Sequence, residues 1–318
     1  MSSSILNFND NHLNVHNSVS SNNYIYITYL SNDRDYKGVL LLNYCLQKYQ
    51  HKYNLHCIIL EGVSIKVKNI LAKFNIFLHE YNLNNILNDF HITNDYKDYL
   101  LNKHYYGKFI IFKLIQYDKI IYLDSDLLIK ENIDHLFRYD TTENKIYMTY
   151  DVLMNNKNIM VHKDKFNSGV IILKPSMEIY NTCYQSLYKY EIMKNQLSSD
   201  QTILEKLNNE KQIRVMYLQF KYNYIPLLTT TNIIEENPVI IHFILTPKPW
   251  QLLDLEDNVV NICRHSNAEK YFNEWIHLYF ELIHKEFDKI NQHKLYFSYD
   301  KIYTKINNEI IEEIPHLE

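Results

Sequence analysis

The chain has 318 residues, of which 46% are hydrophobic, so it can bury the core of one large α/β domain or of two smaller ones. Its net charge of −4 offers no basic face for nucleic acid, and the lack of a long apolar run or a signal-peptide core argues against a membrane span. Four cysteines stand far apart without a CxxC pair, which argues against a disulfide framework or a zinc site and favours a soluble protein of the reducing cytoplasm.

Predicted strands and helices alternate in the first half of the chain. Residues 1–22 are polar and aperiodic, so we expect a disordered lead-in there. Runs of β-branched and aromatic residues predict four strands, at Tyr24–Leu30, Leu55–Leu60, Asn75–Tyr81 and Lys119–Leu123. Helical spacing predicts helices that end near Tyr49, cover Ile65–Lys73 and cover Lys108–Tyr117. This alternation is typical of a doubly wound α/β fold, with a mainly parallel sheet flanked by helices and ligands at the carboxyl ends of its strands.

The second half of the chain is less regular. The runs Ile146–Val152, Ser168–Lys174 and Val239–Ile244 predict strands, and the stretches that open with Pro175 and Ser198 have helical spacing. Residues 268–290 form a long amphipathic pattern, for which core packing is the simplest interpretation and a dimer or membrane contact is the alternative. With no repeat and no linker, we expect a lead-in over 1–22, one domain over 23–265 and a C-terminal helical extension over 266–318.

Glycine is scarce in this chain. There are only four, at Gly38, Gly62, Gly107 and Gly169, where ordinary usage would give about twenty. Where glycine is this rare, we expect each one to occupy a place that no side chain can fill.

Two aspartates interrupt an otherwise apolar run in YLDSDLLI, at Asp124 and Asp126. They directly follow the predicted strand Lys119–Leu123, so one carboxylate can point into a cleft while the other follows the turn. Two hard oxygen ligands in this position suit Mn²⁺ or Mg²⁺ beside phosphate oxygens. The alternative is that Asp126 only starts a turn or caps a helix.

Other polar residues stand where the same ligand would bind. Asn32 follows the first strand, at a βα turn of the kind that binds nucleotides. Lys108 and Lys248 could neutralise a diphosphate, and His242 could add a nitrogen ligand to the metal. Taken singly, each lysine is better explained as a solvated surface residue, the histidine as a core residue, and Asp200 as an acid that caps a helix.

The ordered set of motifs is more specific than any of its members. The series SNDRDYKG, GKF, QYDKIIYLDSD, FNSGVIILKPS, SSDQTILE and HFILTPKPW resembles glycogenin and its relatives, family 8 of the retaining glycosyltransferases. The resemblance runs from about Tyr24 to Trp250. It implies a GT-A fold, in which a Rossmann-like nucleotide half joins an acceptor half. It also implies that the protein moves a hexose-type sugar from a UDP-sugar to the hydroxyl group of an acceptor, which is a protein, a glycan or a small molecule.

The resemblance implies a role for each matched position. The metal, Mn²⁺ or Mg²⁺, would bind Asp124, Asp126 and His242. The remaining donor contacts would be Ser125 at the ribose, Tyr29, Ser31 and Asn32 at the uridine, Lys108 and Lys248 at the diphosphate and sugar, and Asn167, Ser168, Asp200 and Gln201 at the donor sugar. Positive charge aimed at the diphosphate stabilises the leaving group, and an acid near the opposite face of the sugar stabilises an oxocarbenium-like state. Lys108 and Asp200 are therefore the expected catalytic residues, and covalent and front-side attack both stay open.

Several positions depart from the family pattern. The family's aromatic partner for uracil is replaced by Asp35, and Tyr36 follows one residue later as the candidate for that contact. An acid and a glycine of the family become Leu197 and Leu245, and an expected arginine before GKF has only Lys97 or Lys103 as a substitute. No tyrosine lies between Tyr224 and His242, which argues against self-glucosylation there. A catalytically silent UDP-sugar-binding protein is the alternative, and a homodimer is left open. A phosphoryl or nucleotidyl transferase would need a phosphate-binding loop that the sequence lacks.

Overall fold

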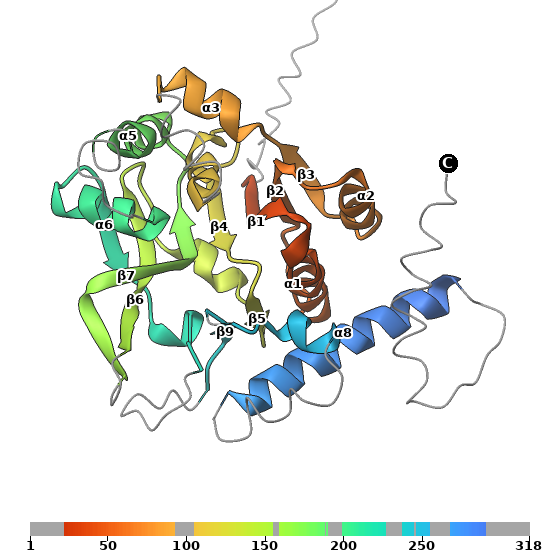
Figure 1. The fold of residues 1–318 in the computed structure, drawn as a ribbon. Helices are drawn as coiled ribbons and strands as arrows, with labels where there is room; N and C mark the ends of the chain where they lie inside the picture. Colours follow the sequence, from red (N-terminus) through yellow and green to blue (C-terminus); the bar gives the residue numbers. More distant parts are fainter. Residues whose placement is uncertain are drawn as a thin grey trace, which may run out of the picture.

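A seven-stranded sheet forms the centre of the protein (Figure 1). The computed structural model describes residues 22–92, 105–154, 159–187, 189, 199–226, 237–244, 246–254 and 268–290. The strand order is β3-β2-β1-β4-β7-β6-β8. These strands are β1 Tyr24–Asn32, β2 Leu55–Gly62, β3 Phe77–Glu80, β4 Lys119–Leu123, β6 Lys145–Met154, β7 Ile159–Leu173 and β8 Arg214–Tyr217. A second sheet pairs β5 Leu127–Ile129 with β9 Ile240–His242.

The prediction of a mainly parallel sheet is confirmed. The pairs of β1 with β2, β2 with β3, β1 with β4 and β6 with β8 are parallel. Only β7 runs antiparallel to its two neighbours, β4 and β6. The short strands β5 and β8 were not predicted, because three or four residues carry too little alternation to stand out in a sequence.

Helices cover both faces of this sheet, and each face has its own hydrophobic core. The helices are α1 Tyr36–Lys48, α2 Ile65–Lys73, α3 Leu83–Asp89, α5 Met177–Leu187, α6 Asp200–Asn209 and α8 Glu269–Ile290. One core packs α1, α2 and α8 against side chains such as Tyr26, Ile59 and Ile121. The other packs α3, α5 and α6 against Ile27, Ile58 and Ile120. The alternation along each strand thus divides the apolar residues between the two faces.

One predicted helix has a different form. The segment Tyr105–Lys113 is a 3₁₀ helix, in place of the α-helix expected over Lys108–Tyr117. Every residue from Tyr106 to Phe112 is buried, so burial extends around the segment and is not confined to one stripe. Shorter 3₁₀ helices cover Asp33–Asp35, Asp134–Arg138, Phe220–Tyr222 and Pro249–Asp254.

The helix α8 packs against α1 and belongs to the same core as the sheet (Figure 1). Trp275 is fully buried and stacks on Tyr279, with ring centroids 5.2 Å apart. Its ring also lies 5.8 Å from that of Trp250. The interpretation of this amphipathic pattern as core packing is therefore confirmed for the buried face of α8. Residues 1–21 of the predicted lead-in and residues 291–318 of the predicted extension lie outside the described residues.

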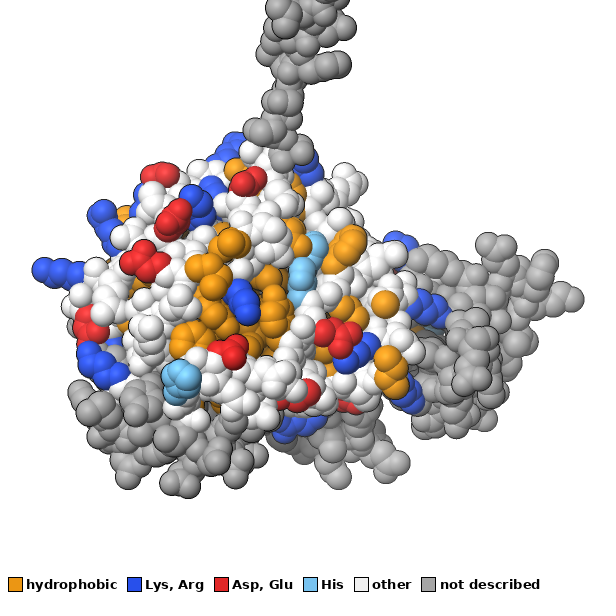
Figure 2. Space-filling model, turned by 90° about the horizontal axis from the view of Figure 1, so that it is seen from above, with side chains coloured by type: hydrophobic (Ala, Val, Ile, Leu, Met, Phe, Trp, Pro, Cys, Tyr) orange, Lys and Arg blue, Asp and Glu red, His pale blue; other side chains and the backbone are white. Residues whose placement is uncertain are grey.

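The described surface is mixed in charge. On the face seen in Figure 2, acidic and basic side chains alternate around hydrophobic ones, so its described residues form no continuous basic surface. Within the described ranges, no helix combines the length and the apolar character needed to cross a membrane. Cys45, Cys57 and Cys183 are buried free thiols, and Cys263 lies outside those ranges.

Candidate active site

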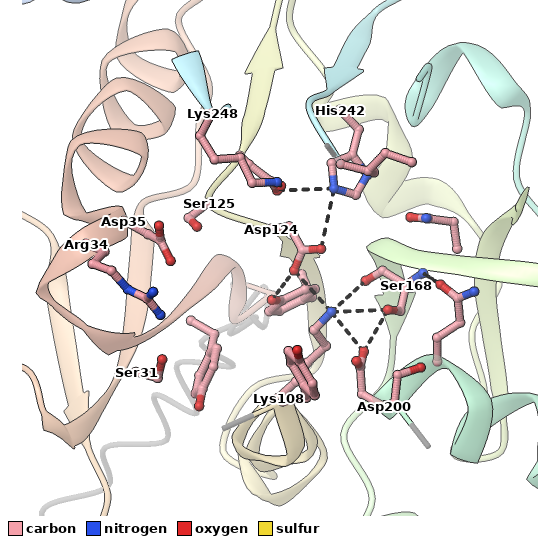
Figure 3. A pocket seen from close by; sticks show the side chains of 18 of the residues that line it. Ser31, Arg34, Asp35, Lys108, Asp124, Ser125, Ser168, Asp200, His242 and Lys248 are labelled. Atoms are coloured by element: carbon pink, nitrogen blue, oxygen red, sulfur yellow. Dashed lines mark hydrogen bonds and ion pairs between the residues drawn. The ribbon is translucent and has the colours of Figure 1, made fainter. Parts of the chain in front are cut away.

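A cavity of about 470 Å³ opens at the carboxyl ends of β1 and β4, within the size range of small-molecule sites (Figure 3). All but one of the predicted site residues line it: Tyr29, Ser31, Asn32, Lys108, Asp124, Ser125, Asp126, Asn167, Ser168, Asp200, Gln201, His242 and Lys248. The exception is Tyr36, which begins α1 and packs against the hydrophobic core. The fold therefore gathers residues that are up to about 220 positions apart in the chain into one pocket, as expected of strand ends along one sheet edge.

Asp124, Asp126 and His242 form a group whose ligand atoms all lie within 4.8 Å of one another. Asp124 directly follows β4, and its backbone N–H donates to the carbonyl of Gly169 at 2.8 Å. The turn then leads into β5, whose antiparallel pairing sets Leu127 opposite His242. As a result His242 Nε2 lies 3.1 Å from an oxygen of Asp126 and 3.7 Å from one of Asp124.

The hydrogen bonds around His242 hold its ring in the orientation that a metal ligand needs. Asn223 is fully buried, and its amide nitrogen donates to Thr149 Oγ1 at 3.0 Å and to Asn167 Oδ1 at 2.7 Å. Its Oδ1 is therefore left to accept from Nδ1 of His242, at 2.9 Å. With the proton on Nδ1, the lone pair of Nε2 faces the two carboxylates. Two carboxylates and one imidazole nitrogen are a donor set that fits Mn²⁺ or Mg²⁺.

Lys248 and Asp126 form a close pair at the same end of the pocket. Lys248 Nζ lies 2.5 Å from Asp126 Oδ2 and 2.5 Å from the carbonyl oxygen of Phe243. Burial would raise the pKa of Asp126, but the neighbouring His242 and Lys248 outweigh it and hold that pKa well below its usual range. Asp126 is therefore an anion, ready to bind a cation.

Lys108 lies between two acids in the floor of the pocket. Its Nζ is 2.9 Å from Asp200 Oδ2 and 3.1 Å from Asp124 Oδ1, and the residue is buried. Burial would lower the pKa of Lys108, but the two carboxylates reverse the effect and raise it above its usual value. The ammonium group therefore stays charged and joins Asp124 to Asp200 on the far wall of the pocket.

Asp200 is held on that far wall by its position at the start of α6. Ser199 caps this helix, with its Oγ accepting from the N–H of Thr202, so Asp200 does not cap it. The Asp200 carboxylate instead accepts from Ser168 Oγ at 2.7 Å. Gln201 accepts from the N–H of Ser168 at 3.3 Å and donates to Asp151 at 2.8 Å. The capping residue is therefore Ser199, while Asp200 lies in the first turn of α6, where the helix dipole favours an acid.

The pocket contains residues to which the sequence analysis gave no binding role. They are Arg34, Asp35, Tyr105, Tyr122, Ser199, Ile244 and Trp250 in its lining, with Asn223 and Asp151 behind them. Arg34, Asp35 and Trp250 belong to the matched motifs SNDRDYKG and HFILTPKPW, so a reading of every polar or aromatic residue in those motifs would have found them. Asn223 carries no such signal, because only the pairing of distant segments brings it to His242.

Several departures noted in the sequence cannot be placed in the pocket. Leu197, Leu245, Lys97 and Lys103 lie outside the described residues, as does most of the stretch between Tyr224 and His242.

Comparison with known proteins agrees with this geometry. The chain is 24% identical over 274 residues to the uncharacterized protein R707 of Acanthamoeba polyphaga mimivirus, covering 82% of this chain and 95% of that protein. It is 24% identical over 323 aligned positions to glycogenin of Komagataella phaffii, covering 92% of this chain and 70% of that protein. Galactinol synthase 1 of Arabidopsis thaliana is 27% identical over 197 residues, covering 54% and 55%.

Solved structures show the same fold. The galactosyltransferase LgtC, in complex with donor and acceptor sugar analogs, superposes with a TM-score of 0.51 at 18% identity, covering 79% of this chain and 95% of that chain. The bifunctional glycosyltransferase WbbM superposes with a TM-score of 0.56 at 15% identity, covering 92% and 52%. The fold is therefore the GT-A fold of glycosyltransferases. The model of glycosyl transferase family 8 matches residues 12–254, and with this match the chain belongs to that family.

Proposed function

We propose that the protein is a metal-dependent retaining glycosyltransferase that moves a hexose-type sugar from a UDP-sugar to an acceptor hydroxyl. The observation that carries this proposal is the convergence of Asp124, Asp126 and His242 with two lysines, Lys108 and Lys248, in one pocket. Membership of the family supports sugar transfer, and the pocket supports a donor with a diphosphate group. The glycogenin-like motifs of the sequence favour a nucleotide-activated hexose.

The metal end of the pocket would bind the diphosphate. A divalent cation held by Asp124, Asp126 and His242 would supply positive charge to the phosphate oxygens. Lys248 lies beside this group and can turn its ammonium from the Phe243 carbonyl to a phosphate oxygen. Both charges act where negative charge grows as the glycosidic C–O bond breaks, and so they favour departure of UDP.

The opposite end of the pocket would bind the donor sugar. Lys108 and Ser168 hold the carboxylate of Asp200 in one position in the wall of the cavity. Asp200 lies beyond Lys108 as seen from Asp124 (Figure 3). A fixed anion in this place stabilises an oxocarbenium-like sugar after UDP begins to leave. The acceptor hydroxyl would then add from the face that UDP leaves, with or without an intermediate on Asp200.

The proposal is tested by UDP release from a panel of UDP-sugars, in Mn²⁺, in Mg²⁺ and in EDTA. We expect metal-dependent release from one sugar, with a loss of at least about a hundredfold in Asp126→Asn. Asp89→Asn is the matched control, because Asp89 is an exposed acid outside the pocket. UDP binding without release from any sugar would favour the catalytically silent UDP-sugar-binding protein. Failure to bind UDP with either metal would overturn both.

The stereochemistry of the product is an independent test. NMR of the transferred sugar distinguishes the two anomers, and we expect the product to keep the anomeric configuration of the donor. An inverted product would contradict a retaining mechanism while leaving the transferase activity in place.

A further inference from the structure

The turn between β1 and α1 presents an arginine and an aspartate to the pocket where an aromatic residue was expected. Arg34 and Asp35 both line the cavity, while Tyr36 does not. Figure 3 shows the two side chains entering beside Ser31 and Ser125, at the end opposite Asp200. If the metal binds the diphosphate and Asp200 faces the sugar, this end is left for the nucleoside.

In the part of the chain that the structure describes, neither side chain has a structural role that would account for its place at the cavity. Asp35 occupies the N-cap position of α1, yet its carboxylate makes no capping hydrogen bond there. Arg34 donates from Nε to Asn32 Oδ1 at 3.2 Å, which orients the guanidinium and leaves its terminal nitrogens directed at the cavity. Burial raises the pKa of Asp35, an effect that the charge of Arg34 opposes. The pair is therefore a half-buried acceptor beside an oriented donor.

We propose that Arg34 and Asp35 read the hydrogen-bonding edge of the donor base, and that they select uracil against cytosine. Uracil presents a ring N–H between two carbonyl oxygens, so Asp35 can accept from the N–H while Arg34 donates to a neighbouring carbonyl. Cytosine presents a ring nitrogen lone pair at the same place, which would face the Asp35 carboxylate. This inference rests on the proposed function, because it assigns the nucleoside end of the same pocket.

The recognition differs in kind from stacking on an aromatic ring. A stacked ring accepts every base, since every base has a π-face, whereas a donor and acceptor pair discriminates by pattern. A well-formed pair of this type is worth about ten- to a hundredfold in discrimination. Replacing the Asp35 carboxylate with an amide changes the pattern, because the amide can donate to the ring nitrogen of cytosine.

The experiment measures the affinities of UDP, CDP and GDP by calorimetry in the presence of Mn²⁺, for the native protein, Asp35→Asn and Asp33→Asn. Asp33 is the matched control, because it lies in the same turn, does not line the cavity and accepts from the N–H of Ser64 at 2.8 Å, a bond that an amide oxygen retains. We expect the native protein to prefer UDP to CDP by at least about tenfold. In Asp35→Asn this ratio should fall by about tenfold or invert, and in Asp33→Asn it should not change.

The ratio of the UDP and CDP affinities is used because removing a negative charge near the diphosphate strengthens the binding of both nucleotides alike. An unchanged ratio in a folded Asp35→Asn protein would overturn the inference, as would tighter binding of GDP than of UDP by the native protein. Turnover separates this inference from the proposed function. If the affinity ratios are as expected but no UDP is released from any UDP-sugar, the base contact stands and the transferase function is refuted. If the native protein turns over a UDP-sugar but Asp35→Asn leaves the UDP to CDP affinity ratio unchanged, the transferase stands and the base contact is refuted.

Discussion

Gly169 lies directly against the imidazole ring of His242. A Cβ at Gly169 would stand 2.3 Å from Cε1 and 2.6 Å from Nδ1 of that ring, closer than side chains ever approach. The carbonyl of the same glycine accepts the backbone N–H of Asp124, so this one residue contacts both Asp124 and His242. The expectation that the rare glycines occupy places closed to side chains is confirmed here, and at Gly38, whose Cβ would stand 2.3 Å from the Ser125 carbonyl.

Gly169→Ala should displace His242 and weaken the metal group. We expect Mn²⁺ affinity to fall by about tenfold or more, because ligand groups must be held in place for tight binding, and the melting temperature to fall with it. Manganese titration and thermal unfolding measure the two effects. The double variant Gly169→Ala/His242→Ala supplies the control, since the added methyl no longer meets a ring and the alanine at 169 should then cost less stability. Equal costs in both backgrounds would refute the contact.

Lys108→Met should leave two carboxylates without the cation between them. Breaking one partner out of a buried charge cluster costs about 3–5 kcal/mol in the free energy of unfolding. UDP release should also fall by about a hundredfold or more, because the charge at the base of the pocket is lost. Chemical denaturation and turnover measure the two effects, with Lys113→Met as the control in the same 3₁₀ helix. Adding Asp200→Asn to Lys108→Met should restore part of the stability and none of the activity.

The free energy of unfolding should decrease in mildly acidic solution because of a histidine pair away from the pocket. His56 Nδ1 lies 2.9 Å from His79 Nε2, and burial together with His79 lowers the pKa of His56 to about 4. Burial lowers the pKa of His79 as well. The unfolded chain takes up protons near pH ~6.5, where the folded protein does not, so stability should be full above that pH and be lost as the pH falls from ~6.5 towards ~4.

This pH effect is measured by denaturant unfolding at several pH values. In His56→Gln the slope of stability against pH between ~6.5 and ~4 should become shallower. The control is His277→Gln, an exposed histidine on α8, which should keep the native slope. If His56→Gln has the same slope of unfolding free energy against pH as the native protein, the histidine pair does not cause the loss of stability in acid.

Trp275→Ala should lower both the stability of the protein and its affinity for UDP, because Trp275 connects the C-terminal helix to the pocket. The side chain is fully buried, so its loss should cost about 3–5 kcal/mol in the free energy of unfolding. Its ring also packs near Trp250, which lines the pocket, so we expect weaker UDP binding in protein that is still folded. Calorimetry below the melting temperature measures the affinity. Asn273→Ala, at an exposed position of the same helix, should change neither quantity.

Most of the pocket could be predicted from the sequence because its residues stand at strand ends and in long, particular motifs. Asp124 and Asp126 interrupt an apolar strand, and Asp200 opens a helix, so each is visible as a local break in pattern. Tyr36 was named for the uracil contact by sequence position alone, and the structure puts it against the core. A shift of one residue at the start of a helix turns a side chain by about 100°, which a sequence motif cannot resolve.

The sequence by itself determined the alternation of strands and helices, the two-faced core and the choice of Asp124, Asp126 and His242 as candidate metal ligands, because each depends on local hydrophobic pattern or on residue type. The tertiary structure alone decided the 3₁₀ form of Tyr105–Lys113 and the antiparallel insertion of β7. It alone also placed Asn223 behind His242 and set Arg34 and Asp35 at the end of the pocket opposite Asp200. These features depend on which distant segments pack together, and the free energy of that packing overrides local preference.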